Sequence, residues 1–386
     1  MGYKKQNFTN FDYDNPLTAE QLINMEEGII HYNEAPSDWE ETFTFQVDTE
    51  YGDVLDLRQT VDIQDTINIS TDTACIMLPK TYDPSGEPVK LVIMNRGAGE
   101  DYYSTKNYPL NKALLAAGFA TLHVRGIPVS FQNDLYINSG YGAPYGSPIF
   151  MRCVVAAYNY VVNKYNIDRG GCGVFGVSCG GLQTINLTNA NVLPIAVVAL
   201  DAPVIDLHND CYFNGGWTTG KLGGKTSAGV AWMYQFDYCD FEAGTYTIDG
   251  TTYEFAVENS TALEKLWQLN KKRVEMYNPY DTSKYIVDVN GENITYGFKF
   301  PCPVKCWFAS NETVNSPAKG MEFIERCRVG GTIAEFRSFP SDKHCTWTQG
   351  TNVNFNGLSI PACSAEMALW LSRWLGKSDK NFGALA

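Results

Sequence analysis

Near its middle the chain reads Gly171-Cys-Gly-Val-Phe-Gly-Val-Ser178-Cys-Gly-Gly-Leu-Gln183. This stretch predicts a strand, a sharp turn and the start of a helix. Its centre, 176–180, fits the pattern G-x-S-x-G, in which glycines on both sides of a serine permit a tight turn that exposes the hydroxyl. Loops rich in Gly and Ser also arise by chance, so five residues alone fit a plain structural turn as well. The flanking sequence favours the exposed serine.

Stretches on both sides of this turn alternate between helical and strand patterns. Apolar residues at helical spacing predict a helix over 147–166, and the apolar run 193–200 predicts a buried strand. The same patterns predict further strands at 89–94, 119–124, 304–309 and 333–339, and further helices at 110–117 and 320–328. The alternation indicates an α/β protein with a doubly wound, mostly parallel sheet. Such sheets bind ligands at the carboxyl ends of their strands, where we expect Gly97, Ser178, Asn311 and His344.

The chain resembles the α/β-hydrolase family from about Thr73 to the C-terminus, particularly its esterase and prolyl-oligopeptidase-like branches. The resemblance is carried by LVIMNRGAGE at 91–100, HVRG at 123–126, GVSCGG at 176–181, FASNETV at 308–314 and FPSDKHCTW at 339–347. The order nucleophile, acid, histidine is also that of the family. The resemblance implies an α/β-hydrolase fold with a lid insertion and a serine nucleophile, Ser178.

One of the four histidines fits the role of general base. His31 lies in the N-terminal segment, His123 in an apolar strand, and His208 in a loop with two aspartates. His344 follows a late strand in a polar turn, at the position where the resembled family keeps its base.

The acid that orients this histidine has several candidates. The family expects an acid after the strand that ends near residue 309, and this chain offers Asn311 and Glu312 there. We favour Glu312, because a carboxylate can stabilise a protonated imidazole whereas Asn311 could fix only the tautomer. Asp201 and Asp206 are the alternatives, since some relatives take the acid from the preceding strand. Both also fit helix caps or turn formers.

An oxyanion hole needs two preorganised backbone N–H donors. We expect one from Cys179, directly after the nucleophile, and the other from Gly97 or Ala98. Arg96 stands where many relatives have His, so it either binds a substrate anion or pairs with a neighbouring carboxylate, Glu100 or Asp101.

The charge and composition of the chain exclude several classes of binding partner. A net charge of −14 argues against nucleic acid and anionic membranes. No stretch has the length of a membrane span, and the first residues lack the apolar core of a signal peptide, so a cytoplasmic protein is expected. The eleven cysteines lack paired metal spacing. Cys302 and Cys306 are better explained by strand alternation than by zinc. No metal or cofactor is expected, and the sequence leaves open whether the chain forms a homo-oligomer.

The predicted organisation has four parts: an attachment segment over 1–40, a first core part over 41–205, a lid over 206–300 and a second core part over 301–386. Segments 41–47 and 68–78 alternate like antiparallel edge strands. The lid holds a group of aromatic residues that could bind a sugar or an aryl acyl group, although such groups are usually core. They are Trp217, Trp232, Tyr234, Phe236 and Tyr238.

The segment 15–29 predicts a short capped helix and resembles a segment of bacteriophage tail and fibre proteins. This resemblance implies attachment to a virion or a larger assembly.

Three functions compete. The first is a serine esterase acting on a carbohydrate-linked or similar small acyl ester. The second is a peptidase or aminoacyl hydrolase of the prolyl-oligopeptidase type, favoured by the doubled glycine after Cys179. The third is a non-catalytic structural or receptor-binding module on the same fold.

Overall fold

The computed structural model describes residues 41–48, 52–59, 63–65, 67–69, 74–97, 102–124, 126, 145–207, 239–240, 245–248, 250–254, 278–282 and 299–376. All of them belong to one compact unit, Glu40–Ala386. The attachment segment 1–40, with its predicted helix, lies outside the described residues.

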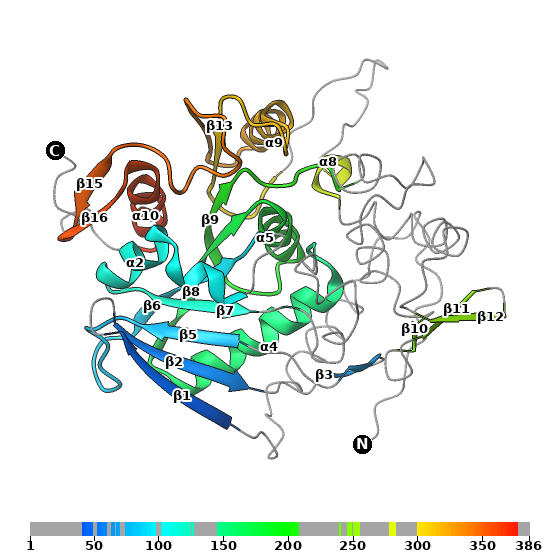
Figure 1. The fold of residues 1–386 in the computed structure, drawn as a ribbon, viewed down its shortest axis with the longest axis horizontal. Coiled ribbons are helices and arrows are strands. Elements are labelled where there is room, and N and C mark those ends of the chain that lie inside the picture. Colours follow the sequence, from blue (N-terminus) through cyan, green and yellow to red (C-terminus); the bar gives the residue numbers. More distant parts are fainter. Residues whose placement is uncertain are drawn as a thin grey trace. The chain divides into compact units, whose positions relative to one another are not determined.

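A nine-stranded sheet organises this unit, with strand order β1-β2-β5-β7-β6-β8-β9-β13-β14 (Figure 1). Its strands are β1 Glu41–Asp48, β2 Gly52–Gln59, β5 Ala74–Leu78, β6 Val89–Asn95, β7 Ala120–Val124, β8 Ile167–Val177, β9 Ile195–Asp201, β13 Val304–Ala309 and β14 Ala334–Phe339. From β7 to β14 all neighbours are parallel, while β1, β2 and β5 pair antiparallel at one side. The predicted class, α/β with a mostly parallel sheet, is confirmed.

Helices cover both faces of the sheet. The helices of the described residues are η1 Tyr102–Asn107, α2 Pro109–Ala116, α4 Pro148–Lys164, α5 Cys179–Ala190, α8 Pro279–Thr282, α9 Pro317–Val329 and α10 Ala362–Trp374. Helices α2 and α10 pack against each other on one face, and α4 packs against α5 on the other (Figure 1). Ser147 and Ser316 cap α4 and α9, each followed by a proline at the first helical position. This layering leaves the loops at the carboxyl ends of the parallel strands to form the site.

The predicted strand 68–78 is wrong as a single element. Its first part, β4 Ile67–Ile69, pairs with β3 Ile63–Asp65 in a separate two-stranded sheet, and only β5 joins the main sheet. The stretch Ser-Thr-Asp-Thr at 70–73, between the two parts, lies outside the described residues.

Two further small antiparallel sheets occur among the described residues. In one, a turn after Ile248 joins β11 Thr245–Ile248 to β12 Thr251–Glu254, with Gly250 at φ 76°, and β10 Cys239–Asp240 pairs with β11. In the other, β15 Asn352–Phe355 pairs with β16 Leu358–Pro361. The rest of the predicted lid lies largely outside the described residues, so the four-part organisation stays a prediction.

Within the described ranges, no helix combines the length and the apolar character that crossing a bilayer requires. Among the cysteines whose side chains the structure describes, Cys345 is partly exposed and the others are buried.

Candidate active site

Ser178 occupies a strained turn between β8 and α5. Its backbone has φ 55° and ψ −122°, a conformation that residues other than glycine rarely adopt. The Ser178 N–H donates to the Asp201 carbonyl at 2.9 Å, and the Ser178 carbonyl accepts from Val204 at 2.9 Å and from Gly181 at 3.0 Å. The bonds to Asp201 and Val204 tie the turn to the end of β9, and Ser178 remains partly exposed.

Three glycines make this turn sterically feasible. A Cβ at Gly176 would lie 2.2 Å from the Gly180 carbonyl oxygen, and one at Gly180 would lie 2.3 Å from the carbonyl oxygens of Asn95 and Arg96. A Cβ at Gly181 would lie 2.3 Å from Pro203 Cβ. Because the clash at Gly180 is with the backbone of Asn95 and Arg96, the turn packs directly on the end of β6.

Gly180→Ala therefore should lower the free energy of unfolding by about 3 kcal/mol or more, since no flexible side chain can move aside. Chemical denaturation of the full chain measures this. Gly171→Ala is the control, because its Cβ would meet a side-chain methyl, that of Ala196, at 3.1 Å. Equal stability of the two variants would contradict the close approach of β6 and the turn.

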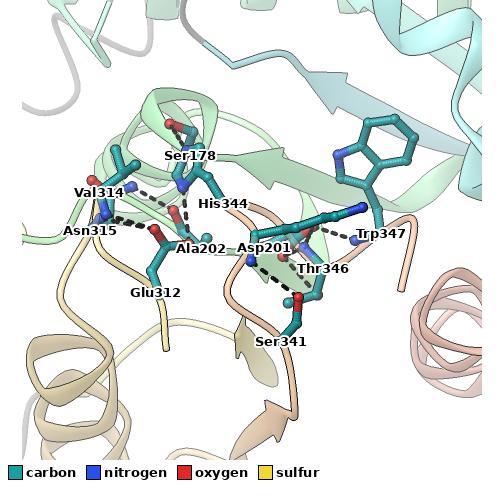
Figure 2. Close-up of polar contacts among 11 residues, drawn as sticks. Ser178, Asp201, Ala202, Glu312, Val314, Asn315, Ser341, His344, Thr346 and Trp347 are labelled. Atoms are coloured by element: carbon teal, nitrogen blue, oxygen red, sulfur yellow. Dashed lines mark hydrogen bonds and ion pairs between the residues drawn. The ribbon is translucent and has the colours of Figure 1, made fainter. Parts of the chain in front are cut away.

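His344 follows β14 and reaches Ser178. Its Nε2 lies 2.9 Å from Ser178 Oγ, although the two residues are 166 positions apart (Figure 2). The imidazole retains 28% of its exposure, so one edge remains accessible to a substrate.

Glu312 lies on the other side of the imidazole. Its Oε2 is 3.0 Å from His344 Nδ1, and its Oε1 accepts from the Val314 N–H at 2.8 Å and the Asn315 N–H at 3.5 Å. The Glu312 side chain has no exposed surface. An ionised carboxylate only accepts hydrogen bonds, so Nδ1 carries the proton and Nε2 is free to accept one from Ser178.

The other acid candidates contact other groups. Asn311 is exposed, and its N–H donates to the Ser341 carbonyl at 2.9 Å. Asp206 pairs with Lys319 Nζ at 2.7 Å and accepts from Asn278 at 3.2 Å. The Asp201 carboxylate bonds the chain just beyond His344, at Thr346 and Trp347 (Figure 2). The structure therefore brings Glu312, rather than these three, to the imidazole.

Of the expected oxyanion donors, Cys179 is the first residue of α5 and follows Ser178 directly. Gly97 follows β6, the strand beside β8, and its carbonyl accepts from Arg96 Nη1 at 3.2 Å. Ala98 lies outside the described residues, as do Glu100 and Asp101, so the ion pair considered for the buried Arg96 is outside them too.

The substrate-binding candidates Trp217, Trp232 and Tyr234, together with Phe236 and Tyr238, also lie outside the described residues.

His123 is buried within the sheet. Its Nδ1 lies 2.5 Å from Thr105 Oγ1 and its Nε2 lies 3.1 Å from Thr121 Oγ1. Burial, aided by the nearby charge of Lys106, lowers the pKa of His123 to about 3, so it is neutral at physiological pH. His31 and His208 lie outside the described residues.

No group of three or more metal-ligating side chains occurs within the ranges that the structure describes. Cys302 and Cys306 are buried, and burial raises the pKa of both thiols, to about 12 for Cys302.

Two residues near the site escaped the sequence analysis. The Asn315 amide donates to the Ala202 carbonyl at 2.6 Å, and Thr346 bonds Asp201. Their partners are 113 and 145 positions away, so no local pattern could have indicated them.

The fold is shared with solved structures of low sequence identity. Candida antarctica lipase A in its closed state aligns with a TM-score of 0.51 and 14% identity, over 96% of this chain and 94% of that one. An S-formylglutathione hydrolase from Agrobacterium tumefaciens aligns with a TM-score of 0.51 and 12% identity, over 86% and 99%. The chain has the α/β-hydrolase fold.

A Mycobacterium tuberculosis puromycin-hydrolyzing peptidase shares this α/β-hydrolase fold, with a TM-score of 0.52 and 13% identity over 86% of this chain and 41% of that one. No family model matches the sequence, and no curated protein sequence matches it significantly. At such identities the likeness shows the fold alone.

Proposed function

We propose that the protein is a serine hydrolase that cleaves a carboxylic ester through an acyl-enzyme. One observation carries the proposal: Ser178, His344 and Glu312 form a continuous chain of hydrogen bonds at 2.9 and 3.0 Å. A serine hydroxyl is a weak nucleophile unless an adjacent base takes its proton, and the base must itself be oriented by a third group.

The first half of the reaction forms an ester on the enzyme. Ser178 Oγ attacks the carbonyl carbon while its proton moves to His344 Nε2, and Glu312 stabilises the resulting imidazolium. The N–H groups of Cys179 and the 97–98 segment would stabilise the tetrahedral oxyanion. The bond to the alcohol then breaks, and the alcohol oxygen takes the proton from His344.

The second half repeats these steps with water. His344 removes a proton from water, the hydroxide attacks the acyl carbon, and the carboxylic acid leaves as Ser178 recovers its proton. No step needs a metal or an organic cofactor, because each role falls to a protein group.

For the substrate we propose a small acyl ester on a carbohydrate. The aromatic residues of the 206–300 stretch support this, since aromatic faces pack against sugar rings. The resemblance of the N-terminal segment to phage fibre proteins adds the proposal of attachment to a virion or larger assembly, with a bacterial surface polysaccharide as substrate. Release of acetate from acetylated polysaccharides, compared with their deacetylated forms, tests the substrate class.

One argument for a peptidase, the doubled glycine after Cys179, has another explanation. The doubled glycine Gly180-Gly181 has a steric reason, because Cβ atoms at these positions would strike the β6 end and Pro203. It therefore no longer favours a peptidase over an esterase.

A burst experiment tests the proposed reaction. Mixing the protein with p-nitrophenyl acetate should release nitrophenol in a burst that approaches one equivalent per chain wherever deacylation is slower than acylation. Aminoacyl-naphthylamides should react far more slowly, and the reverse preference would favour the peptidase. Reaction with neither class in a folded sample would favour the non-catalytic module.

A further inference from the structure

Asp201 connects the two turns that carry Ser178 and His344. It is the last residue of β9 and has no exposed surface. Its carbonyl accepts the N–H of Ser178 at 2.9 Å. Its carboxylate accepts the N–H and the hydroxyl of Thr346 at 2.8 Å each, and the N–H of Trp347 at 2.9 Å.

The chain around Asp201 is strained at three places. Ser178 has φ 55°, Ala202 has φ 44° and Cys345 has φ 72°, all in the left-handed region that residues other than glycine rarely occupy. Cys345 lies between His344 and the two residues that bond Asp201. Such conformations persist only where surrounding contacts fix them, and the Asp201 carboxylate supplies those contacts for the His344 turn.

We propose that Asp201 is a positioning residue that holds the imidazole of His344 against Ser178, through the turn at 345–347. The inference rests on the proposed function. It assigns Asp201 a role distinct from that of the acid, because Glu312 already occupies Nδ1 of His344.

Ionisation of the Asp201 carboxyl group lowers the stability of the folded protein. Burial raises the pKa of Asp201 from 3.8 to about 6, although the bonds from Thr346 and Trp347 and the charge of His344 oppose the rise. Since the folded value is the higher one, the contribution of this group to stability is full below pH 3.8 and is lost as the pH rises through about 6. The thiols that face it, Cys306 and Cys363, stay neutral because burial raises the pKa of each.

The test compares Asp201→Asn with Asp206→Asn in the full chain. Asp206 is also a buried carboxylate, five positions further on, but it bonds Lys319 and Asn278 rather than the His344 turn. An amide at 201 would turn an N–H group toward the N–H donors of Thr346 or Trp347. We expect kcat of D201N to fall about 10²-fold with KM changed less than about threefold, because misplacing a catalytic group affects the chemical step. D206N should keep kcat within about twofold of the wild type.

A second variant and a second measurement distinguish a local effect on the His344 turn from a loss of the whole fold. Thr346→Val removes one donor and keeps the carboxylate, so it should lower kcat by only about three- to tenfold. Hydrogen exchange of the peptide that contains 344–349 should become faster in D201N and stay unchanged in D206N, and this readout needs no activity.

Each outcome decides something. Unchanged exchange in D201N overturns the holding role of Asp201, and faster exchange with wild-type kcat overturns its link to catalysis. A fall in kcat that is equal in D201N and D206N would reduce Asp201 to a general structural role. If the wild-type protein shows neither turnover nor labelling of Ser178 by a fluorophosphonate probe, the proposed function fails. The catalytic part of this inference then fails with it.

Discussion

Ser178→Ala is expected to lower kcat on the order of 10⁵-fold while leaving the fold intact, because the variant has no atom that can form the acyl-enzyme. The methyl group of alanine fits where the hydroxymethyl group of Ser178 stood, and the backbone bonds to Asp201 and Val204 remain. KM should change little, since the residual reaction would use the same binding groups. Steady-state hydrolysis of p-nitrophenyl acetate, with active-site titration of the wild type, measures the effect.

The control for this experiment is Ser359→Ala, in the β15–β16 hairpin, where the hydroxyl accepts from Asn352 at 3.2 Å. This variant should keep wild-type turnover. Activity of S178A within tenfold of the wild type would show that another group is the nucleophile.

Glu312→Gln is expected to lower kcat by about 10³- to 10⁴-fold through the tautomer of His344. The Val314 N–H donates to one oxygen of Glu312 at 2.8 Å, so a glutamine would keep its oxygen there and present its NH₂ group to His344 Nδ1. Nδ1 would then have to accept a hydrogen bond, which moves the ring proton to Nε2. Protonated Nε2 cannot take the proton of Ser178.

The matched variant is Asn311→Ala, which removes the neighbouring candidate for the acid. Because Asn311 is exposed and bonds Ser341 only through its backbone, N311A should keep kcat within about twofold of the wild type. Loss of turnover in N311A together with an active E312Q would transfer the orienting role to Asn311. Circular dichroism of both variants checks that the fold is retained.

The parallel strands were predictable because their signals are local. Strands buried on both faces are continuous apolar runs, so β6, β9 and β13 could be found within one or two residues of their bounds. The turn at Ser178 was equally readable, since glycines at 176, 180 and 181 stand where a Cβ would strike neighbouring backbone or Pro203. In both cases the residues that carry the signal, an apolar run or a set of glycines, lie close together in the sequence.

The remaining features depend on contacts between distant parts of the chain. The sequence favoured Glu312 over Asn311 only through the charge of its carboxylate, because the register of the loop after β13 is fixed by bonds to Ser341 and Ala202. The contacts of Asp201 with the turn after His344 could not be predicted either, because its side chain bonds residues 145 and 146 positions away. The hairpin of β15 and β16 was missed although its turn, Asn356-Gly357, with φ of 49° and 85°, carries a strong local signal.

The most direct test of the account is to treat the folded protein with a fluorophosphonate probe and to identify the modified peptide by mass spectrometry. Such a probe phosphonylates only a serine whose proton a neighbouring base can remove. The account predicts one adduct, on Ser178, formed in the wild type and absent from S178A. An adduct on another residue, or no adduct in a sample shown to be folded, would contradict it.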